Sequence, residues 1–299
     1  MNKKIKKYFK NPKLIVINLM NRGFFSLLPD KLYLKWKYRL YFGRKLNLNN
    51  PVTFNEKLQW LKLYDRNQLY TNLVDKYEVR KYIADTIGEE YLIPLIGIYD
   101  KVEDIDFEKL PNQFVMKCTH DSGSAIVCKN KSSFNWTESM KKIKKSLKRN
   151  YYYYGREWPY KNVNPRIIIE KYISNNNSDL NDFKYFVFNG KVSYYLICSD
   201  RKKDLKFTFF DKNNNFIDVK QDDCLNDKNV KRPKNHQKMM ELARILSKDI
   251  CHVRVDFYEI NDKIYFGELT FFDSSGFGKF EPEEWDYRFG NMLKLPGRR

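Results

Sequence analysis

Two carboxylates near the C-terminal end have the residue types and spacing of a metal site. Asp256 and Glu268 lie in the segment HVRVDFYEINDKIYFGELTF, residues 252–271, on either side of a short polar turn. β-branched and aromatic residues dominate both flanks, so we predict a β-hairpin. Side chains alternate between the two faces of a strand, which places Arg254 with Asp256 and Thr270 with Glu268. If strand pairing brings these faces together, the two carboxylates suit Mg²⁺, which takes oxygen ligands and substrate phosphates. Spacing alone leaves an ordinary surface hairpin open.

A second segment has the composition of a phosphate-binding loop between two strands. Residues 114–129 read FVMKCTHDSGSAIVCK, with Lys117 in the first apolar run and Gly123 in the loop. Backbone amides of a loop with Gly and Ser can approach phosphate oxygens, and a lysine on the preceding strand adds a point charge. The single glycine matches neither a Walker sequence nor a dinucleotide fingerprint. A plain hairpin is therefore the alternative.

An apolar strand with a charge pair is predicted over residues 165–173, PRIIIEKYI. Buried strands seldom carry charges such as Glu170 and Lys171 unless the charges are paired or lie at an exposed edge. We therefore expect a strand that links two parts of the protein and turns its backbone toward a ligand.

A further hairpin is predicted over residues 182–197, DFKYFVFNGKVSYYLI. The Asn189-Gly190 pair is the strongest short-range hairpin signal in the chain. Lys184 lies early in the first strand, where its side chain either points into the same cleft or is solvated on an open sheet face.

In this order the segments resemble the ATP-grasp superfamily and, more narrowly, the TupA-like ATP-grasp family of bacterial surface-polysaccharide clusters. The resemblance extends to NPVTFNEKLQWLKLYDRN and LPNQFVMKCTHDSGS, and runs from about Leu27 to the C-terminus. It implies an α+β fold in which two α+β lobes clasp the nucleotide, preceded by a mainly helical N-terminal region. We expect a basic N-terminal segment (1–26), a mainly helical region (27–110) and an ATP-grasp body (111–299) with a hinge strand near 166–173.

The resemblance also implies roles for individual residues. Arg254 and Lys184 would act on the transferring phosphoryl group, and Asp256 and Glu268 would hold Mg²⁺. Thr270 stands where many ATP-grasp enzymes have a metal-ligating Asn. The residues implied to bind ATP are Lys117, Thr119, Ser122, Gly123, Ser124, Glu170, Lys171, Tyr172, Ile173 and Lys184.

The implied reaction is ATP-dependent carboxylate–amine ligation through an acyl phosphate, in the synthesis or modification of a bacterial capsular or teichuronic-type polysaccharide. The substrates would be a small carboxylate and an amine, or a polysaccharide or lipid-linked precursor. A glycosyltransferase that uses a sugar nucleotide is the second candidate. A noncatalytic anion-binding protein is the third.

Composition restricts the partners and the compartment. The 299 residues carry a formal charge of +19, which predicts attraction to anions such as acidic glycans or lipid headgroups. The basic residues are spread along the chain without a helix-turn-helix, zinc-finger or RNP pattern, which argues against nucleic acid. The 5 cysteines are scattered and form no CxxC pair, as expected for reduced thiols in a cytoplasmic protein.

The N-terminal segment, MNKKIKKYFKNPKLIVINLM, is too short in its apolar part to cross a bilayer. A basic amphipathic helix at the inner face of the membrane is one interpretation, and a helix packed on the body is the other.

The remaining helices follow from apolar periodicity. Thr53 and Glu56 form a capping-box pattern for the first of them. The tyrosine-rich stretch at 151–160 is expected to be a loop or packing patch, whose rings could also stack on sugars or bases. We predict helices over residues 55–63, 71–87, 138–149 and 235–248.

Overall fold

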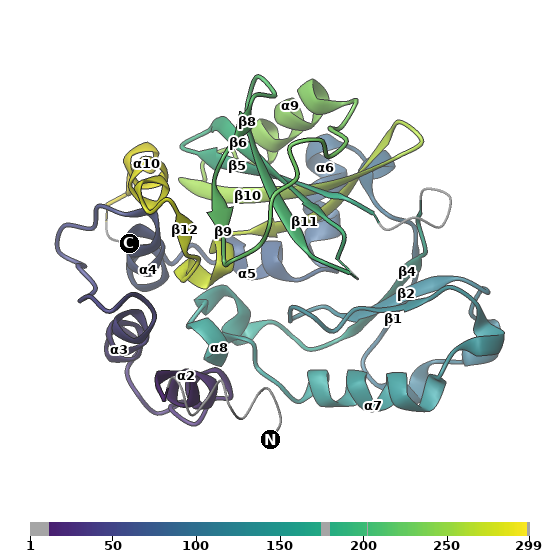
Figure 1. Ribbon diagram of the computed structural model, residues 1–299. Helices are drawn as coiled ribbons and strands as arrows, with labels where there is room; N and C mark the ends of the chain where they lie inside the picture. Colours follow the sequence, from purple (N-terminus) through teal and green to yellow (C-terminus); the bar gives the residue numbers. More distant parts are fainter. Residues whose placement is uncertain (1–11, 175–179, 202, 298–299) are drawn as a thin grey trace.

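Two antiparallel sheets build the body of the protein in a computed structural model that describes residues 12–174, 180–201 and 203–297 (Figure 1). The smaller sheet has the order β1-β4-β2-β3, and the larger has the order β11-β10-β5-β6-β7-β8. The small sheet contains β1 (Leu95–Tyr99), β2 (Phe114–Cys118), β3 (Ile126–Cys128) and β4 (Ile167–Lys171). The large sheet contains β5 (Asp182–Phe188), β6 (Lys191–Ser199), β7 (Lys206–Asp211), β8 (Phe216–Ile217), β10 (His252–Ile260) and β11 (Lys263–Thr270). A third, two-stranded sheet pairs β9 (Lys220–Gln221) with β12 (Phe280–Glu281).

Helices surround these sheets and supply most of the N-terminal region. The α-helices are α2 (Lys13–Asn21), α3 (Asp30–Phe42), α4 (Phe54–Tyr64), α5 (Leu69–Val74), α6 (Val79–Ile87), α7 (Trp136–Leu147), α8 (Tyr152–Gly155), α9 (His236–Leu246) and α10 (Glu284–Met292). The short 3-10 helices are η1 (Glu89–Tyr91), η2 (Val102–Asp104), η3 (Phe107–Lys109), η4 (Lys131–Ser133), η5 (Trp158–Asn162) and η6 (Asp273–Gly276). Among the described residues, no helix is both long and apolar enough to cross a bilayer.

The hairpins predicted from the sequence are confirmed. β5 and β6 pair around Asn189 and Gly190, which both have positive φ, at 48° and 76°. This backbone is the one that an Asn-Gly turn favours, because it matches the twist of the flanking strands. β2 and β3 pair across the Gly123 loop, and β10 pairs with β11.

One helix prediction is wrong, and a buried aspartate explains why. Residues 71–87 form two helices, α5 and α6, instead of one. Asp75 ends α5 in an extended conformation, and its carboxylate accepts hydrogen bonds from the amides of Tyr77 and Glu78. The same carboxylate pairs with Arg166 at 3.0 Å. The ion pair with distant Arg166 and the local turn at Asp75 together end the helix, although the apolar periodicity continues. The capping box of α4, by contrast, forms as predicted from Thr53 and Glu56.

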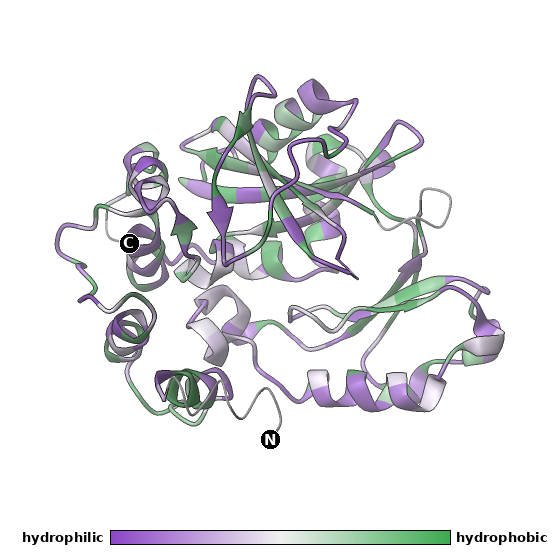
Figure 2. Ribbon diagram, viewed as in Figure 1, coloured by the Kyte–Doolittle hydropathy of each residue, from purple (hydrophilic) through white to green (hydrophobic). Residues whose placement is uncertain are grey.

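Each sheet has its own apolar core. The small sheet packs against α7, where Met140 and Ile143 join strand residues such as Phe114 in one cluster. Figure 2 shows mostly hydrophilic residues along the rest of α7. The large sheet packs against α9. The region expected to be mainly helical also contributes β1 to the small sheet, so it is built into the body of the protein.

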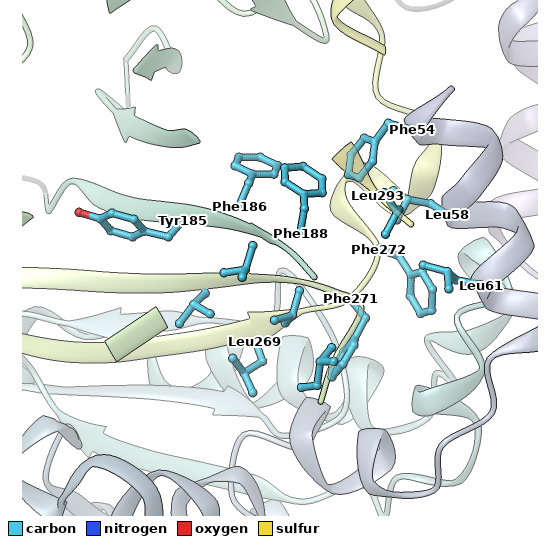
Figure 3. Close-up of a cluster of buried hydrophobic side chains, with 14 of the residues drawn as sticks. Phe54, Leu58, Leu61, Tyr185, Phe186, Phe188, Leu269, Phe271, Phe272 and Leu293 are labelled. Carbon is cyan, nitrogen blue, oxygen red and sulfur yellow. The ribbon is translucent and has the colours of Figure 1, made fainter. Parts of the chain in front are cut away.

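Helix α4 fixes the end of the hairpin that carries the candidate metal ligands. Figure 3 shows Phe54, Leu58 and Leu61 in one cluster with the aromatic residues that follow β11, Phe271 and Phe272. All five side chains are buried. Burying large apolar side chains on both sides of this junction stabilises it by roughly 1.5–3 kcal/mol for each side chain. The segment after β11 is therefore held against the helical region.

Candidate functional site

A cavity of about 430 Å³ has walls from both sheets. The small sheet contributes Lys117 from β2 and Glu170 from β4, and the large sheet contributes Asp256 from β10 and Glu268 from β11. Segments that are far apart in the sequence thus meet around one space, as expected of a site between two lobes.

The small-sheet wall carries an ion-pair network centred on Glu170. The Glu170 carboxylate lies 2.7 Å from Nζ of Lys117 and 3.2 Å from the Arg80 guanidinium. A second lysine, Lys76, also lines the cavity and donates to the backbone carbonyl of Asp121. Burial lowers the pKa of Lys76, although the negative charge of Glu268 opposes this shift. The wall therefore presents two ammonium groups to the cavity.

The predicted phosphate loop divides into residues that face the cavity and one that does not. Ser122, Gly123 and Ser124 line the cavity, and Gly123 has a φ of 88° with open space where a Cβ would stand. The Ser124 hydroxyl donates to Asp121 at 2.5 Å. Thr119 is fully buried outside the cavity wall, and its hydroxyl lies 3.4 Å from the Asn164 carbonyl. The sequence does not separate Thr119 from its neighbours.

The segment that leaves β4 also faces the cavity, with Lys171, Tyr172 and Ile173 among the lining residues. The Lys171 amide is already used, because it donates to the Pro94 carbonyl at 2.9 Å. The Ile173 amide donates to no other backbone group in the described part of the chain. The apolar residue Val115 lines the same cavity.

On the large-sheet wall, the hairpin brings the predicted residues together as the sequence indicated. Asp256 stands directly opposite Glu268, and Arg254 stands directly opposite Thr270. Directly opposite residues in antiparallel strands share a face. The predicted convergence of one cation and two carboxylates is therefore confirmed.

The two carboxylates have different surroundings. The Asp256 carboxylate accepts hydrogen bonds from Arg254 at 2.7 and 2.8 Å and also from Lys184. Burial alone would raise its pKa, but the charges of Arg254 and Lys184 outweigh burial and lower the pKa to about 2. The Glu268 side chain is 44% exposed, and its nearest basic partner is Arg254 at 3.5 Å. Glu268 is thus the carboxylate with room for a new ligand.

Lys184 lies behind the cavity wall. Its side chain is buried and pairs with Asp256 and, at 3.2 Å, with Asp182. It is absent from the residues that line the cavity. The interpretation of Lys184 as a solvated surface lysine is therefore wrong, because two carboxylates compensate its burial. A direct phosphate contact would require its ammonium group to leave this pair.

The donor set fits a magnesium ion only with help from a ligand. The described ranges contain no group of three or more His, Cys, Asp or Glu side chains arranged to hold a metal. Mg²⁺ is commonly held by one or two carboxylates together with substrate phosphates and water. Glu268 and Asp256, which both line the cavity, match that pattern. The Thr270 hydroxyl lies 3.1 Å from the Arg254 guanidinium, so its oxygen is already engaged.

Several residues of the site were missed in the sequence analysis. Asp182 and Arg201 line the cavity and pair with each other, and Asp273 pairs with Arg254. Strand alternation could have identified Asp182, which stands two residues before Lys184 on the same face. Lys76 lies between two helices that the periodicity merged, so only the tertiary structure brings it to the site.

A second cavity, also of about 430 Å³, adjoins the first. Ser122 and Glu268 line both cavities, and Arg254 and Thr270 line the second. Of the two hairpin acids, Glu268 therefore stands at the junction of the two spaces, while Asp256 lines only the first. A group bound in one cavity can reach a group bound in the other at Glu268.

The chain belongs to the TupA-like ATP-grasp family. The description TupA-like ATPgrasp matches residues 56–294, which is most of the chain. The family and the α+β ATP-grasp fold predicted from the sequence are thereby confirmed. A comparison with curated proteins finds no match.

Solved structures give weaker similarities. The D-alanine–D-alanine ligase from Bacillus anthracis is 17% identical over 66% of this chain and 56% of its own, with a TM-score of 0.40. The corresponding ligase from Helicobacter pylori is 15% identical over 80% of this chain and 69% of its own, with a TM-score of 0.41. An N5-carboxyaminoimidazole ribonucleotide synthetase in its ADP complex is 14% identical over 72% of this chain and 50% of its own, with a TM-score of 0.42. The chain thus spans little more than half the length of the first of these ligases.

Proposed function

We propose that this protein is an ATP-dependent carboxylate–amine ligase that acts through an acyl phosphate. One observation carries the proposal: Glu268 stands where two cavities meet, and the first of these has lysines on the opposite wall. A triphosphate in the first cavity would place its reacting end at this junction. Membership of the TupA-like ATP-grasp family supports ATP as the nucleotide.

The nucleotide would lie between the two sheets. Lys117 and Lys76 carry the positive charge that phosphates require, and the amides of the Gly123 loop can approach phosphate oxygens. The adenine would lie near Tyr172 and Ile173, which line the cavity. These assignments follow the roles that the resemblance implies.

Both reactants of the first step are anions, so catalysis depends on position and charge. A carboxylate oxygen attacks the γ-phosphorus of ATP, the bond to the β–γ bridging oxygen breaks, and ADP leaves. The amine, as its free base, then attacks the acyl carbon, phosphate leaves, and the nitrogen loses a proton to solvent as the amide forms. Arg254 is fixed by Asp256 and Asp273 at the junction, where it can stabilise charge that develops on the transferring group. Bound Mg²⁺ would supply further charge neutralisation.

Under this proposal, Glu268 and Asp256 hold the magnesium ion. Glu268 offers an exposed oxygen, while Asp256 is engaged by two cations and contributes mainly by fixing Arg254. The amide product would belong to a bacterial capsular or teichuronic-type polysaccharide or its precursor, as the family resemblance implies.

The test measures nucleotide consumption by the full chain. Purified protein is incubated with Mg-ATP, with UDP-sugars or with neither, in the presence of pooled carboxylates and amines, and ADP and UDP are quantified. We expect ADP release that requires both a carboxylate and an amine. UDP release without ADP would support the glycosyltransferase candidate and overturn the ligase. Release of neither, with ATP bound at equilibrium, would indicate a noncatalytic anion-binding protein.

A further inference from the structure

The second cavity differs from the first in the chemistry of its walls. Aromatic rings dominate it, and three carboxylates face it. The aromatic residues are Tyr41, Tyr151, Tyr154, Tyr160, Phe272 and Phe277, and the acids are Glu157, Asp222 and Glu268. Aromatic faces and carboxylates both attract cations.

The basic groups of this cavity are already compensated. Arg254 pairs with Asp256 and Asp273, neither of which lines the second cavity. Lys37 is buried and donates to Asn21 at 2.7 Å and to the Tyr154 carbonyl. Burial lowers the pKa of Lys37 well below its ordinary value, while the charge of Glu157 opposes this shift. The charge available to a ligand in this cavity is therefore negative.

Glu157 is the acid most enclosed by the protein. It is 5% exposed, and the Ser275 side chain hydrogen-bonds to it. Burial raises the pKa of Glu157, while the charges of Lys62 and Lys37 oppose the rise. Lys62 donates to the carbonyls of Gly155 and Ser275, each at 2.7 Å, and so fixes the backbone on both sides of the carboxylate. Such fixed geometry suits a ligand contact.

We propose that the second cavity binds the amine partner of the ligation through its ammonium group, with Glu157 as counter-ion and the tyrosine rings as walls. This inference rests on the proposed ligase function. It places the amine in the second cavity, on the other side of Glu268 from the nucleotide. The surroundings of Lys37 illustrate the same recognition within the protein. Its Nζ lies 4.6 Å from the ring centre of Tyr154 and 4.8 Å from that of Phe277.

Two sets of charge-matched probes test the site. The first set is D-glucosamine, N-acetyl-D-glucosamine and D-glucuronate, and the second is glycinamide, acetamide and acetate. Each is titrated by ligand-observed NMR into the full chain saturated with Mg-ADP. We expect the cation of at least one set to bind about 10-fold more tightly than its neutral and anionic counterparts, as for a desolvated charge pair.

Variants locate the binding. Glu157→Gln keeps the shape of the side chain and should abolish the preference for the cation, while ADP affinity stays within about 2-fold. Asp222→Asn, at an exposed position of the same cavity, should weaken cation binding by about 2- to 3-fold and keeps one oxygen that can accept a hydrogen bond. Glu281→Gln, on the exposed edge of β12, is the matched control and should change nothing.

The outcomes separate this inference from the proposed function. A cation preference that persists in Glu157→Gln, tighter binding of the anion, or no preference in either set overturns the amine site. If the wild-type protein did not bind ADP, that result would instead count against the nucleotide site and hence against the proposed function.

A second, independent observation concerns the surface formed by α2, α3 and the segment between them. Six of the large apolar side chains that are exposed in the described chain lie within this short stretch. They are Ile15, Val16, Phe24, Leu27, Leu32 and Trp36, with exposures of 46%, 38%, 72%, 98%, 39% and 51%. Figure 2 shows hydrophobic colouring on α2 and on the segment that follows it. We name these six residues the apolar surface patch.

Basic residues accompany the apolar surface patch. On α3 the exposed residues Lys31, Lys35 and Arg39 follow a four-residue spacing, and so do Leu32 and Trp36. Residues four apart lie on the same side of a helix, so a basic row runs next to an apolar row. Exposed apolar groups flanked by lysine and arginine match the interface of a bilayer that contains anionic lipid.

We further infer that the apolar surface patch docks the protein on an anionic lipid surface. The test is sedimentation of the full chain with phosphatidylcholine vesicles and with vesicles that also contain about one third phosphatidylglycerol. We expect binding only to the second kind, and weaker binding at high salt. The double variant Leu27→Glu/Trp36→Glu should lose it by about 10-fold or more.

A matched control guards against a general effect of added charge. Leu225→Glu replaces another leucine that is 57% exposed, outside the patch, and should bind as the wild type does. Equal loss in both variants, or no binding by the wild type, overturns the inference. A dimer in light scattering that the double variant abolishes would assign the patch to a second copy of the chain and also overturn it.

Discussion

The two walls of the first cavity hold their charges in different ways. On the large-sheet wall, Arg254 and Asp256 come from one strand and are fixed by neighbouring buried ions. On the small-sheet wall, Lys117 pairs with Glu170, and the adjoining loop is exposed around Gly123. A wall of interlocked buried ions keeps its geometry without a ligand, whereas an exposed loop can move when a ligand binds. Pre-organisation therefore belongs mainly to the large sheet.

The comparison is sharpest between the two acids of the hairpin. Asp256 and Glu268 stand opposite each other, yet the first is enclosed by two cations and the second is half exposed. We infer that Asp256 serves the structure of the wall as well as the reaction, and that Glu268 serves the reaction alone.

The largest effect on activity is expected from Glu268→Gln. Loss of one charged group at the junction should lower the rate of ADP formation by ~10² to 10³, by analogy with removal of a preorganised donor. Stability should change by less than about 0.5 kcal/mol, because the side chain is 44% exposed. Steady-state ADP release and thermal unfolding measure the two quantities. Glu284→Gln, a surface acid on α10, is the control, and equal activity in both variants would contradict the metal assignment.

Asp256→Asn should lower the stability of the folded protein by disrupting the ion network of the large-sheet wall. Removing one partner from a buried ion network costs about 3 kcal/mol, because Arg254 and Lys184 lose a shared counter-ion. Urea unfolding of this variant and of the exposed control Asp262→Asn measures the difference. If Asp256→Asn were as stable as the wild type, the description of this wall as a stabilising network would be wrong.

Acid should weaken the same wall. The folded-state pKa of Asp256 is about 2, against an ordinary value of 3.8, so its contribution is complete above about pH 4 and is lost as the pH falls through about 2. The difference corresponds to about 2 kcal/mol. Melting temperatures between pH 5 and pH 2 should fall less steeply in Asp256→Asn than in the wild type. Parallel curves would show that this carboxylate does not control the acid response.

Lys117→Met tests the small-sheet wall. Loss of one phosphate-directed charge should weaken ATP binding by about 10-fold, or 1.4 kcal/mol. Folding should be little affected, because Glu170 keeps its partner Arg80. Fluorescence titration with a labelled nucleotide gives the affinity, and Lys81→Met on the exposed face of α6 serves as control. An unchanged affinity would place the phosphates elsewhere in the cavity.

The smallest effect is expected from Gly123→Ala. The φ of 88° is unfavourable for an L-residue by roughly 1–2 kcal/mol, although a Cβ would meet no neighbouring atom. We expect the loop to relax and the KM for ATP to rise by a few-fold, with little change in unfolding. A rise as large as that of Lys117→Met would indicate that the loop is as rigid as the sheet beside it.

Much of the site was predictable because local patterns determine strands and turns. The Asn189-Gly190 turn and the alternation in β10 and β11 fix which side chains share a face, so the pairing of Asp256 with Glu268 could be read from the sequence. The resemblance to the TupA-like ATP-grasp family supplied the order of the parts. The separation of α5 from α6 at Asp75 could not be predicted, because its partner Arg166 is distant in the sequence.

The sequence by itself determined the hairpins, the capped helix α4 and the family, since each depends on residues close together in the chain. Only the tertiary structure decided which charges are available to a ligand. It buried Lys184 behind Asp256, turned Thr119 away from the cavity and placed Glu157 beside the tyrosines. The physical reason is that the availability of a charge depends on burial and on partners from other strands, which residue order does not encode.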